Sequence, residues 1–110
     1  MGKFKIYAGK DAQLYFKLVA GNGEEILRSE GYKTRAACNK GIESVKKNAA
    51  MQERFETKVA KDGQQYFVLK AGNHQVIGVS EMYKSADGCN NGIQSVKKNA
   101  PDAAIEDTTV

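Results

Sequence analysis

The chain is an internal duplication. When the sequence is shifted by 51 positions against itself, residues 4–49 align with 55–100 without a gap, and 25 of those 46 pairs are identical, far more than chance produces. Two units are too few for a solenoid, which generally needs about three repeats to bury a continuous core. The duplication therefore favours two units closed around a pseudo-twofold axis, like a symmetric dimer fused into one chain.

Length and composition are those of one folded domain. We assign residues 1–110 to a single domain, with repeat one at about 2–54 and repeat two at about 55–107. Charged residues at 27% and hydrophobic residues at 41% argue against disorder. Without tyrosine, the longest unbroken apolar run is three residues, too short for a membrane span or an export signal. We therefore expect a cytoplasmic protein that does not bind membranes.

Each repeat begins with a strand-like pattern. Apolar and polar residues alternate along 4–7 and 14–20, and a third strand is expected around 25–29. Asn22-Gly23 marks a hairpin turn, since this pair tolerates the positive φ that tight turns need. Repeat two repeats the pattern at 64–71 and 76–80, after a first strand that begins at Phe55. Three antiparallel strands are thus predicted in each repeat.

A helix follows the strands in each repeat. Thr34 and Ser85 are placed as N-caps, and Pro101 ends the second helix. Gly41 and Gly92 lie mid-helix, where glycine is costly, so we expect close packing against them. Each helix carries apolar residues at the spacing of a single face, Cys38, Gly41, Ile42, Val45 and Ala49 in the first and Cys89, Gly92, Ile93, Val96 and Ala100 in the second.

The segments after the two helices complete the prediction. Met51–Phe55 and Ala103–Asp107 are each expected to add one short strand. The first of these would run into the strand at Phe55 and so join both repeats in one sheet. The residues therefore predict an α+β domain with an antiparallel sheet and helices on one face.

Several segments resemble the YegP-like family of small bacterial proteins. They are G-K-F-x-I-Y near the start, S-E-G-Y-K-T with N-K-G-I-E-S-V-K-K-N-A, and the second copy S-E-M-Y-K-S with N-N-G-I-Q-S-V-K-K-N-A. The resemblance covers residues 2–107. It implies tandem β3-α-β repeats that share one antiparallel sheet, with two helices on one face, pseudo-twofold symmetry and exchanged C-terminal strands. It implies no biochemical activity.

The sequence contains no recognisable catalytic or metal-binding set. His74 is the single histidine, and neither cysteine belongs to a CxxC pair. Cys38 and Cys89 are expected as buried thiols, and whether they meet across the pseudo-twofold axis stays open. We expect no enzyme, no cofactor and no metal; a small-molecule enzyme would require a pocket where the repeats join.

The duplicated loop between strand and helix is the first candidate interaction surface. It keeps four of five residues, either because they organise the helix start or because they form a polar edge for a partner. These residues are Ser29, Glu30, Tyr32 and Lys33 in repeat one and Ser80, Glu81, Tyr83 and Lys84 in repeat two.

The sheet face without helices is the second candidate surface. It would combine tyrosines with lysines, chiefly Tyr15, Lys17, Tyr66 and Lys70, with Lys5 and Tyr7 beside them. Such a face can stack bases and meet phosphates, although many antiparallel sheets also face water in this way. Residues 1–50 carry ten basic and five acidic groups but residues 51–110 carry seven and eight, which disfavours a twofold nucleic-acid binder.

Two functions follow from these observations. The first is a non-enzymatic protein-interaction or accessory module, and the alternative is a weak, sequence-tolerant binder of single-stranded nucleic acid. We expect a monomer, because the duplication already supplies the dimer partner.

Overall fold

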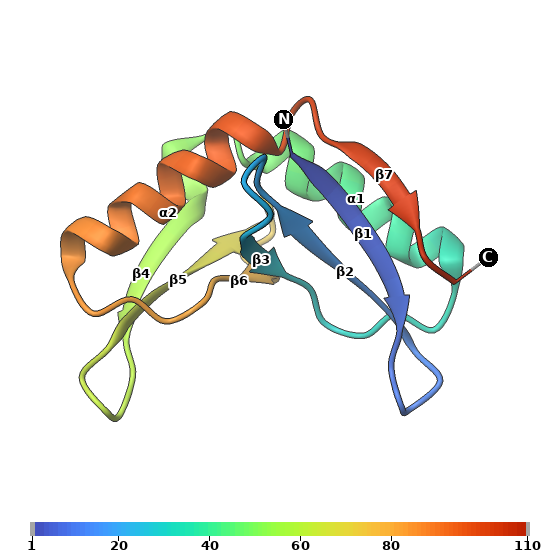
Figure 1. Ribbon diagram of the computed structural model, residues 1–110, viewed down its shortest axis with the longest axis horizontal. Coiled ribbons are helices and arrows are strands. Elements are labelled where there is room, and N and C mark those ends of the chain that lie inside the picture. The colour runs from blue at the N-terminus through green and yellow to red at the C-terminus, as the bar shows by residue number, and fades with distance from the viewer. Residues whose placement is uncertain (1, 110) are drawn as a thin grey trace.

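A single sheet runs through both repeats. The computed structural model describes residues 2–109, and within them the strands follow the order β4-β5-β6-β3-β2-β1-β7, so the repeats meet where β3 pairs with β6 (Figure 1). Repeat one supplies β1 (Lys3–Ala8), β2 (Leu14–Val19) and β3 (Glu25–Arg28). Repeat two supplies β4 (Phe55–Val59), β5 (Gln65–Lys70), β6 (Val76–Val79) and β7 (Ala104–Asp107).

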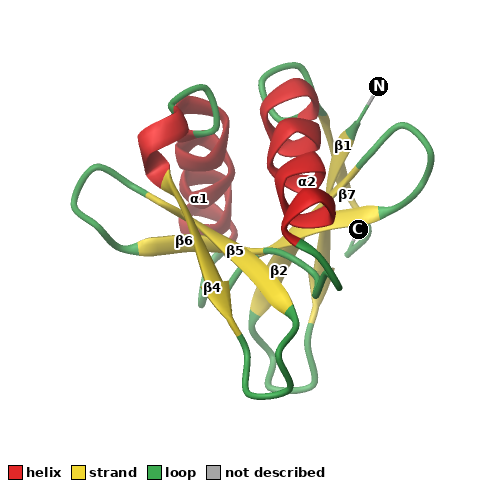
Figure 2. Ribbon diagram, turned by 90° about the vertical axis from the view of Figure 1, so that its left-hand side faces the viewer, coloured by secondary structure: helices red, strands yellow, loops and turns green. Residues whose placement is uncertain are grey.

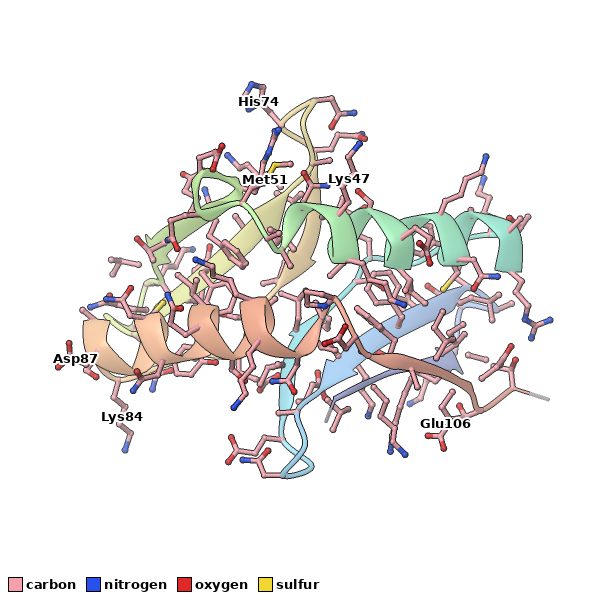
Figure 3. The ribbon with its side chains drawn as sticks, turned by 90° about the horizontal axis from the view of Figure 1, so that it is seen from above. Lys47, Met51, His74, Lys84, Asp87 and Glu106 are labelled. Carbon is pink, nitrogen blue, oxygen red and sulfur yellow. The ribbon has the colours of Figure 1, made fainter. Side chains whose placement is uncertain are left out.

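Two helices cover one face of this sheet. α1 (Arg35–Asn48) and α2 (Ala86–Asn99) lie side by side (Figure 2) and run in opposite directions (Figure 3). The predicted caps are confirmed, because the Thr34 and Ser85 hydroxyls each accept a backbone N–H at 3.1 Å. Neither helix has the length and apolar character needed to cross a membrane.

Both helices pack on strands of both repeats. α1 contacts β2 of its own repeat and β5 and β6 of the other, while α2 contacts β5 and β3. The apolar residues therefore form one core shared by the two repeats. Its largest fully buried members are Phe4, Phe16, Phe67, Ile6, Leu18, Leu27, Ile42 and Leu69.

The join between the repeats depends on one asymmetric contact. β3 and β6 pair through Arg28 and Val79. Leu27 is buried there, whereas the equivalent residue of repeat two is Gly78. A Cβ on Gly78 would lie 2.6 Å from the Leu27 side chain, so one leucine fills the space that two would contest.

The predicted architecture of two repeats, one sheet and helices on one face is confirmed, with two differences. β7 pairs with β1 in parallel, so the sheet is mixed and not wholly antiparallel. The strand expected at Met51–Phe55 is wrong: Gln52–Arg54 forms a 3₁₀ turn, η1, that leads directly into β4. With repeats only 51 residues apart, this segment must cross from α1 to β4, so a single C-terminal strand is exchanged.

Candidate functional site

The serines of the duplicated loops have a structural role. The Ser29 hydroxyl accepts the Phe16 N–H at 2.9 Å and donates to the Glu30 carbonyl at 2.8 Å. Ser80 makes the same two bonds in repeat two, and its side chain is buried. Each serine thus satisfies strand and loop backbone groups, and the two side chains are buried (Ser80) or half-buried (Ser29), so this part of the predicted surface mainly stabilises the fold.

The loop tyrosines explain the mid-helix glycines. Tyr32 stacks on Phe16 at 6.0 Å between ring centroids, and a Cβ on Gly41 would overlap its hydroxyl and lie 3.0 Å from Phe16. Tyr83 and Gly92 repeat this arrangement. Burial raises the pKa of both tyrosines. The close packing predicted at the glycines is confirmed. The nearest side chain at each glycine is the loop tyrosine, Tyr32 at Gly41 and Tyr83 at Gly92.

The charged loop residues do not form one surface. Glu81 pairs with Arg28 at the join between the repeats, whereas Glu30 is exposed. Lys33 and Lys84 are exposed just before the first turns of α1 and α2. The helices run in opposite directions, so the starts of α1 and α2 lie at opposite ends of the helix layer (Figure 3). Lys33 and Lys84, which precede these starts, are therefore far apart. Cys38 and Cys89 lie in the same two first turns, so they do not meet; both are buried free thiols, and burial raises their pKa.

The helix-free face differs between the two repeats. Side chains alternate between faces along a strand, and Phe4 and Ile6 are buried beneath the helices, so Lys5 lies on the helix-free side. A row of paired residues crosses this face from one edge to the other: Glu106, Lys5, Lys17, Arg28, Val79, Val68 and Glu56. The basic positions of repeat one are thus valine or glutamate in repeat two.

The predicted tyrosines and lysines on this face are largely engaged. Tyr15 stacks on Tyr7 at 5.6 Å between ring centroids, and its hydroxyl donates to Asp11 at 2.6 Å, which raises the pKa of Tyr15. The Lys17 ammonium lies 5.5 Å from the Tyr7 ring. In repeat two, Tyr66 faces Lys58 across the strands, so the face carries no symmetric pair of tyrosine stacks.

The cations of this face have carboxylate partners. Lys5 lies 3.8 Å from Glu106 and Lys17 lies 3.9 Å from Glu25. Lys70 pairs with Glu56, and this pair, with Lys58, lowers the pKa of Glu56. Such exposed pairs add little stability, but they reduce the positive charge available to phosphates.

A shallow depression marks the join between the repeats. Its volume is about 270 Å³, and it is lined by Arg28, Val79, Ser80, Glu81 and Met82. The guanidinium of Arg28 is already paired with Glu81 there. Met82 is 50% exposed at its rim.

The outer edge of β1 is covered by β7. The Thr108 N–H and hydroxyl donate to the Ile6 carbonyl at 2.9 and 2.6 Å. Arg35, at the start of α1, lies 2.7 Å from Asp107 and so holds the end of β7. The side chain of Ile6, whose carbonyl accepts the two bonds from Thr108, is 1% exposed.

The equivalent edge of β4 is open among the described residues. In the sheet order β4 has one neighbour, β5. The Ala60 N–H donates to the Gln64 carbonyl at 2.8 Å, and backbone bonding alternates along an antiparallel pair. Thr57 and Val59 therefore direct their N–H and C=O groups away from β5, outward. Val59 is 70% exposed, and we call Phe55–Val59 with these outward groups the β4 edge.

Comparison with known proteins agrees with this duplication. A family model described as "Domain of unknown function (DUF1508)" matches the chain twice, at residues 10–56 and 60–107. The chain belongs to the DUF1508 family.

This DUF1508 chain has relatives that match along nearly their whole length. It is 49% identical over 104 residues to a Stutzerimonas stutzeri "UPF0339 protein in ptx operon 5'region", covering 94% of each chain. It is 46% identical to the UPF0339 protein YegP of Escherichia coli K12, covering 98% of each. The solution NMR structure of E. coli yegP, a protein of unknown function, superposes with a TM-score of 0.92 at 46% identity, covering 97% of this chain and 92% of that one. UPF0339 protein SO3888 from Shewanella oneidensis superposes with a TM-score of 0.90 at 43% identity, covering 96% and 90%.

The β4 edge of this DUF1508 chain was missed by reasoning from the sequence. The residues that are identical in the two repeats include those of the duplicated loops, most of which stabilise the fold. The signal lay in the differences: Ile6 of β1 is Thr57 in β4, and Lys5 is Glu56. Ile6 is buried in the core, and β7 covers the edge of its strand, whereas Thr57 is exposed.

Proposed function

We propose that this protein is a non-enzymatic interaction module that binds an extended segment of a protein along the β4 edge. The observation that carries the proposal is internal to the molecule. The equivalent edge of β1 binds just such a segment, β7, through backbone hydrogen bonds and a terminal ion pair. Adding a strand to an exposed sheet edge is a common way for proteins to recognise peptides.

The β4 edge has the features that this recognition uses. Thr57 and Val59 present outward backbone groups, and the Val59 side chain is the most exposed of the large hydrophobic residues. Proteins commonly protect edge strands with proline, bulges, charged residues or a covering element. Within β4 the charged residues are Glu56 and Lys58, which point to the helix-free face and leave the backbone edge accessible.

The test is a selection of random displayed peptides against the protein. We expect enriched peptides to shift the amide NMR signals of Thr57 and Val59, and to lose binding to a Thr57→Pro variant. Proline at position 57 removes one outward N–H, and edge positions tolerate it. Thr57→Val is the matched control, because it keeps the N–H and should keep binding.

Two results would contradict the proposal. Enriched peptides whose shifts map to the helices or loops would place recognition elsewhere. Binding that survives Thr57→Pro would show that the backbone edge is not used. The amide spectrum of each variant shows whether the fold is kept. We expect that it is, since Thr57 is exposed and lies outside the core.

The nucleic-acid alternative has less support. Its tyrosines and lysines, Tyr15, Lys17, Tyr66 and Lys70, share the helix-free face. Three of them already contact carboxylates: Tyr15 contacts Asp11, Lys17 contacts Glu25 and Lys70 contacts Glu56. A titration with a single-stranded oligonucleotide pool at low and physiological salt separates the two functions. Salt-sensitive shifts at these four residues would favour nucleic acid. Either function fits the cytoplasm, where the buried thiols Cys38 and Cys89 stay reduced.

A further inference from the structure

The β4 edge is complementary to itself. Where two identical strands pair antiparallel about a twofold axis, each residue meets a partner at the same distance from the axis. Placing that axis at Thr57 sets Phe55 opposite the partner's Val59 and Glu56 opposite the partner's Lys58. This inference rests on the function proposed for the β4 edge and names its partner: we propose that the edge pairs with the β4 edge of a second molecule of the same chain, antiparallel and centred on Thr57.

The backbone has the correct phase for this register. Groups that point outward must meet groups that point outward, and Thr57 and Val59 are the outward residues. Thr57 then exchanges N–H···O bonds with the partner's Thr57, and Val59 donates to the carbonyl of the partner's Phe55. The Phe55 N–H is already bonded to the Gln52 carbonyl, so this end of the strand needs only an incoming donor.

The charges also match in this register. Glu56 and Lys58 lie on the same, helix-free face, two positions apart. Each meets the opposite charge of the partner in the type of pair where antiparallel side chains approach most closely. Within one molecule Glu56 already contacts Lys58, at 3.6 Å, and Lys70, on the opposite side of the strand. In the dimer it keeps these contacts and gains the partner's Lys58 as a further one. Continuing the same alignment brings exposed Glu53 towards the partner's exposed Lys61.

The apolar side chains complete the match on the opposite face. Val59 is 70% exposed and Phe55 is half-buried. In the dimer each valine covers the outer side of the partner's Phe55. Thr57 meets the partner's Thr57, and threonine pairs across strands are favourable.

The chain's own C-terminal strand fits this edge less well. β7 sets Glu106 opposite Lys5 in its parallel register with β1. On β4 the same register would set Glu106 opposite Glu56, and like charges directly opposite each other are destabilising. Asp107 would lose Arg35, whose equivalent in repeat two is Ala86. Exchange of β7 between molecules is therefore disfavoured.

This proposal differs from the sequence-based expectation of a monomer. Duplication supplied the contact between β3 and β6 but left the β4 edge open. A single short strand buries far less than the roughly 1,200 Å² of a standard interface, so we expect a weak, concentration-dependent dimer.

Sedimentation velocity from about 10 μM to about 1 mM protein covers the range expected for a weak interface. Glu56→Lys places Lys opposite the partner's Lys58, and Lys58→Glu places Glu opposite the partner's Glu56. Each variant alone should dissociate about tenfold more readily than the wild type or more, because both symmetric pairs become repulsive. An equimolar mixture of the two variants should regain the dimer, since each then meets its opposite charge. Thr57→Pro should be monomeric and Thr57→Val should not.

The outcomes separate this proposal from the proposed function. Restored association in the mixture supports the register centred on Thr57. A dimer that ignores all these substitutions uses another surface and overturns the inference. A monomer throughout, with selected peptides that still shift Thr57 and Val59, overturns self-association and leaves the proposed function standing. A monomer whose Thr57 and Val59 signals respond to no selected peptide overturns both.

Discussion

At the scale of single residues, a comparison of equivalent turns in the two repeats shows which turn residues have a strained backbone. Ala12 has φ of 66° where its equivalent is Gly63 with φ of 85°, and His74 has φ of 70° where its equivalent is Gly23 with φ of 88°. Both residues lie in exposed turns. Left-handed backbone costs an L-residue about 1–2 kcal/mol, while glycine adopts it freely. Each repeat therefore carries one relaxed and one strained turn.

Exchanging these residues should shift stability in opposite directions. We expect Ala12→Gly and His74→Gly to raise the free energy of unfolding by about 0.5–1 kcal/mol each, because the turn strain is relieved. Gly63→Ala and Gly23→Ala should lower it by a similar amount. Urea unfolding monitored by circular dichroism measures all four. If the changes to glycine and the changes to alanine shifted the free energy of unfolding in the same direction, the turns would not be strained.

A second comparison at this scale concerns glycine in the helices. Gly41→Ala and Gly92→Ala should each destabilise the protein by about 1–3 kcal/mol, despite alanine's higher helix propensity, because the new methyl displaces a tyrosine ring. Gly88→Ala is the control within α2. Its Cβ would meet neighbours only at 3.4 Å and beyond, so it should stabilise by up to about 1 kcal/mol. Thermal unfolding of the three variants decides whether the tyrosine contact or propensity dominates.

At the scale of elements, the join between β3 and β6 depends on unequal residues. Leu27 occupies the space above Gly78, and the strands meet in a single residue pair. Exact symmetry would place two leucines or two glycines there, which would mean overlap or a cavity. The repeats have diverged where the pseudo-twofold axis brings equivalent residues together.

This predicts a compensating exchange. Gly78→Leu alone should destabilise by about 1–3 kcal/mol through overpacking, and Leu27→Gly alone by at least about 2 kcal/mol through the cavity it leaves. The double variant should lose less stability than the sum of the two single losses, because the leucine then lies on β6 above a glycine on β3. A double-mutant cycle with no coupling energy would contradict this account.

At the scale of the whole molecule, β7 closes one end of the sheet through charged groups. Hydrogen bonds from Thr109 and the nearby Arg35 lower the pKa of Asp107. A depressed pKa in the folded state means that the carboxylate stabilises the attached strand above the ordinary pKa of aspartate. That stabilisation is lost as the pH falls from about 4 through the lowered value.

Acidification should therefore release β7 before the core unfolds. Amide exchange at Thr108, which donates to Ile6, should accelerate below about pH 4 relative to amides of β2, after correction for intrinsic rates. In Asp107→Asn the protection of Thr108 should be low already at neutral pH and should not change further. Equal protection in the two proteins at all pH values would mean that Asp107 does not hold the strand.

The fold was largely predictable from the sequence. The duplication, the alternation along Leu14–Val19 and the helical spacing from Cys38 onward all depend on local periodicity, which a sequence displays directly. The parallel pairing of β7 was not predictable in this way, because it joins residues about a hundred positions apart. The 3₁₀ turn at Gln52–Arg54 also depended on the short span left between α1 and β4.

The candidate site also separates features that follow from the local sequence from features that depend on distant parts of the chain. By itself, the sequence determined the repeats, their elements and the apolar face that each one buries, because these follow from side-chain order along the chain. Only the tertiary structure decided that Tyr32 packs against Gly41 of α1. It also decided that, among the described residues, β7 covers the edge of β1 while the equivalent edge of β4 has no neighbouring strand. The physical reason is that an edge is a property of the assembled sheet: whether Thr57 has a free backbone depends on where β7 goes.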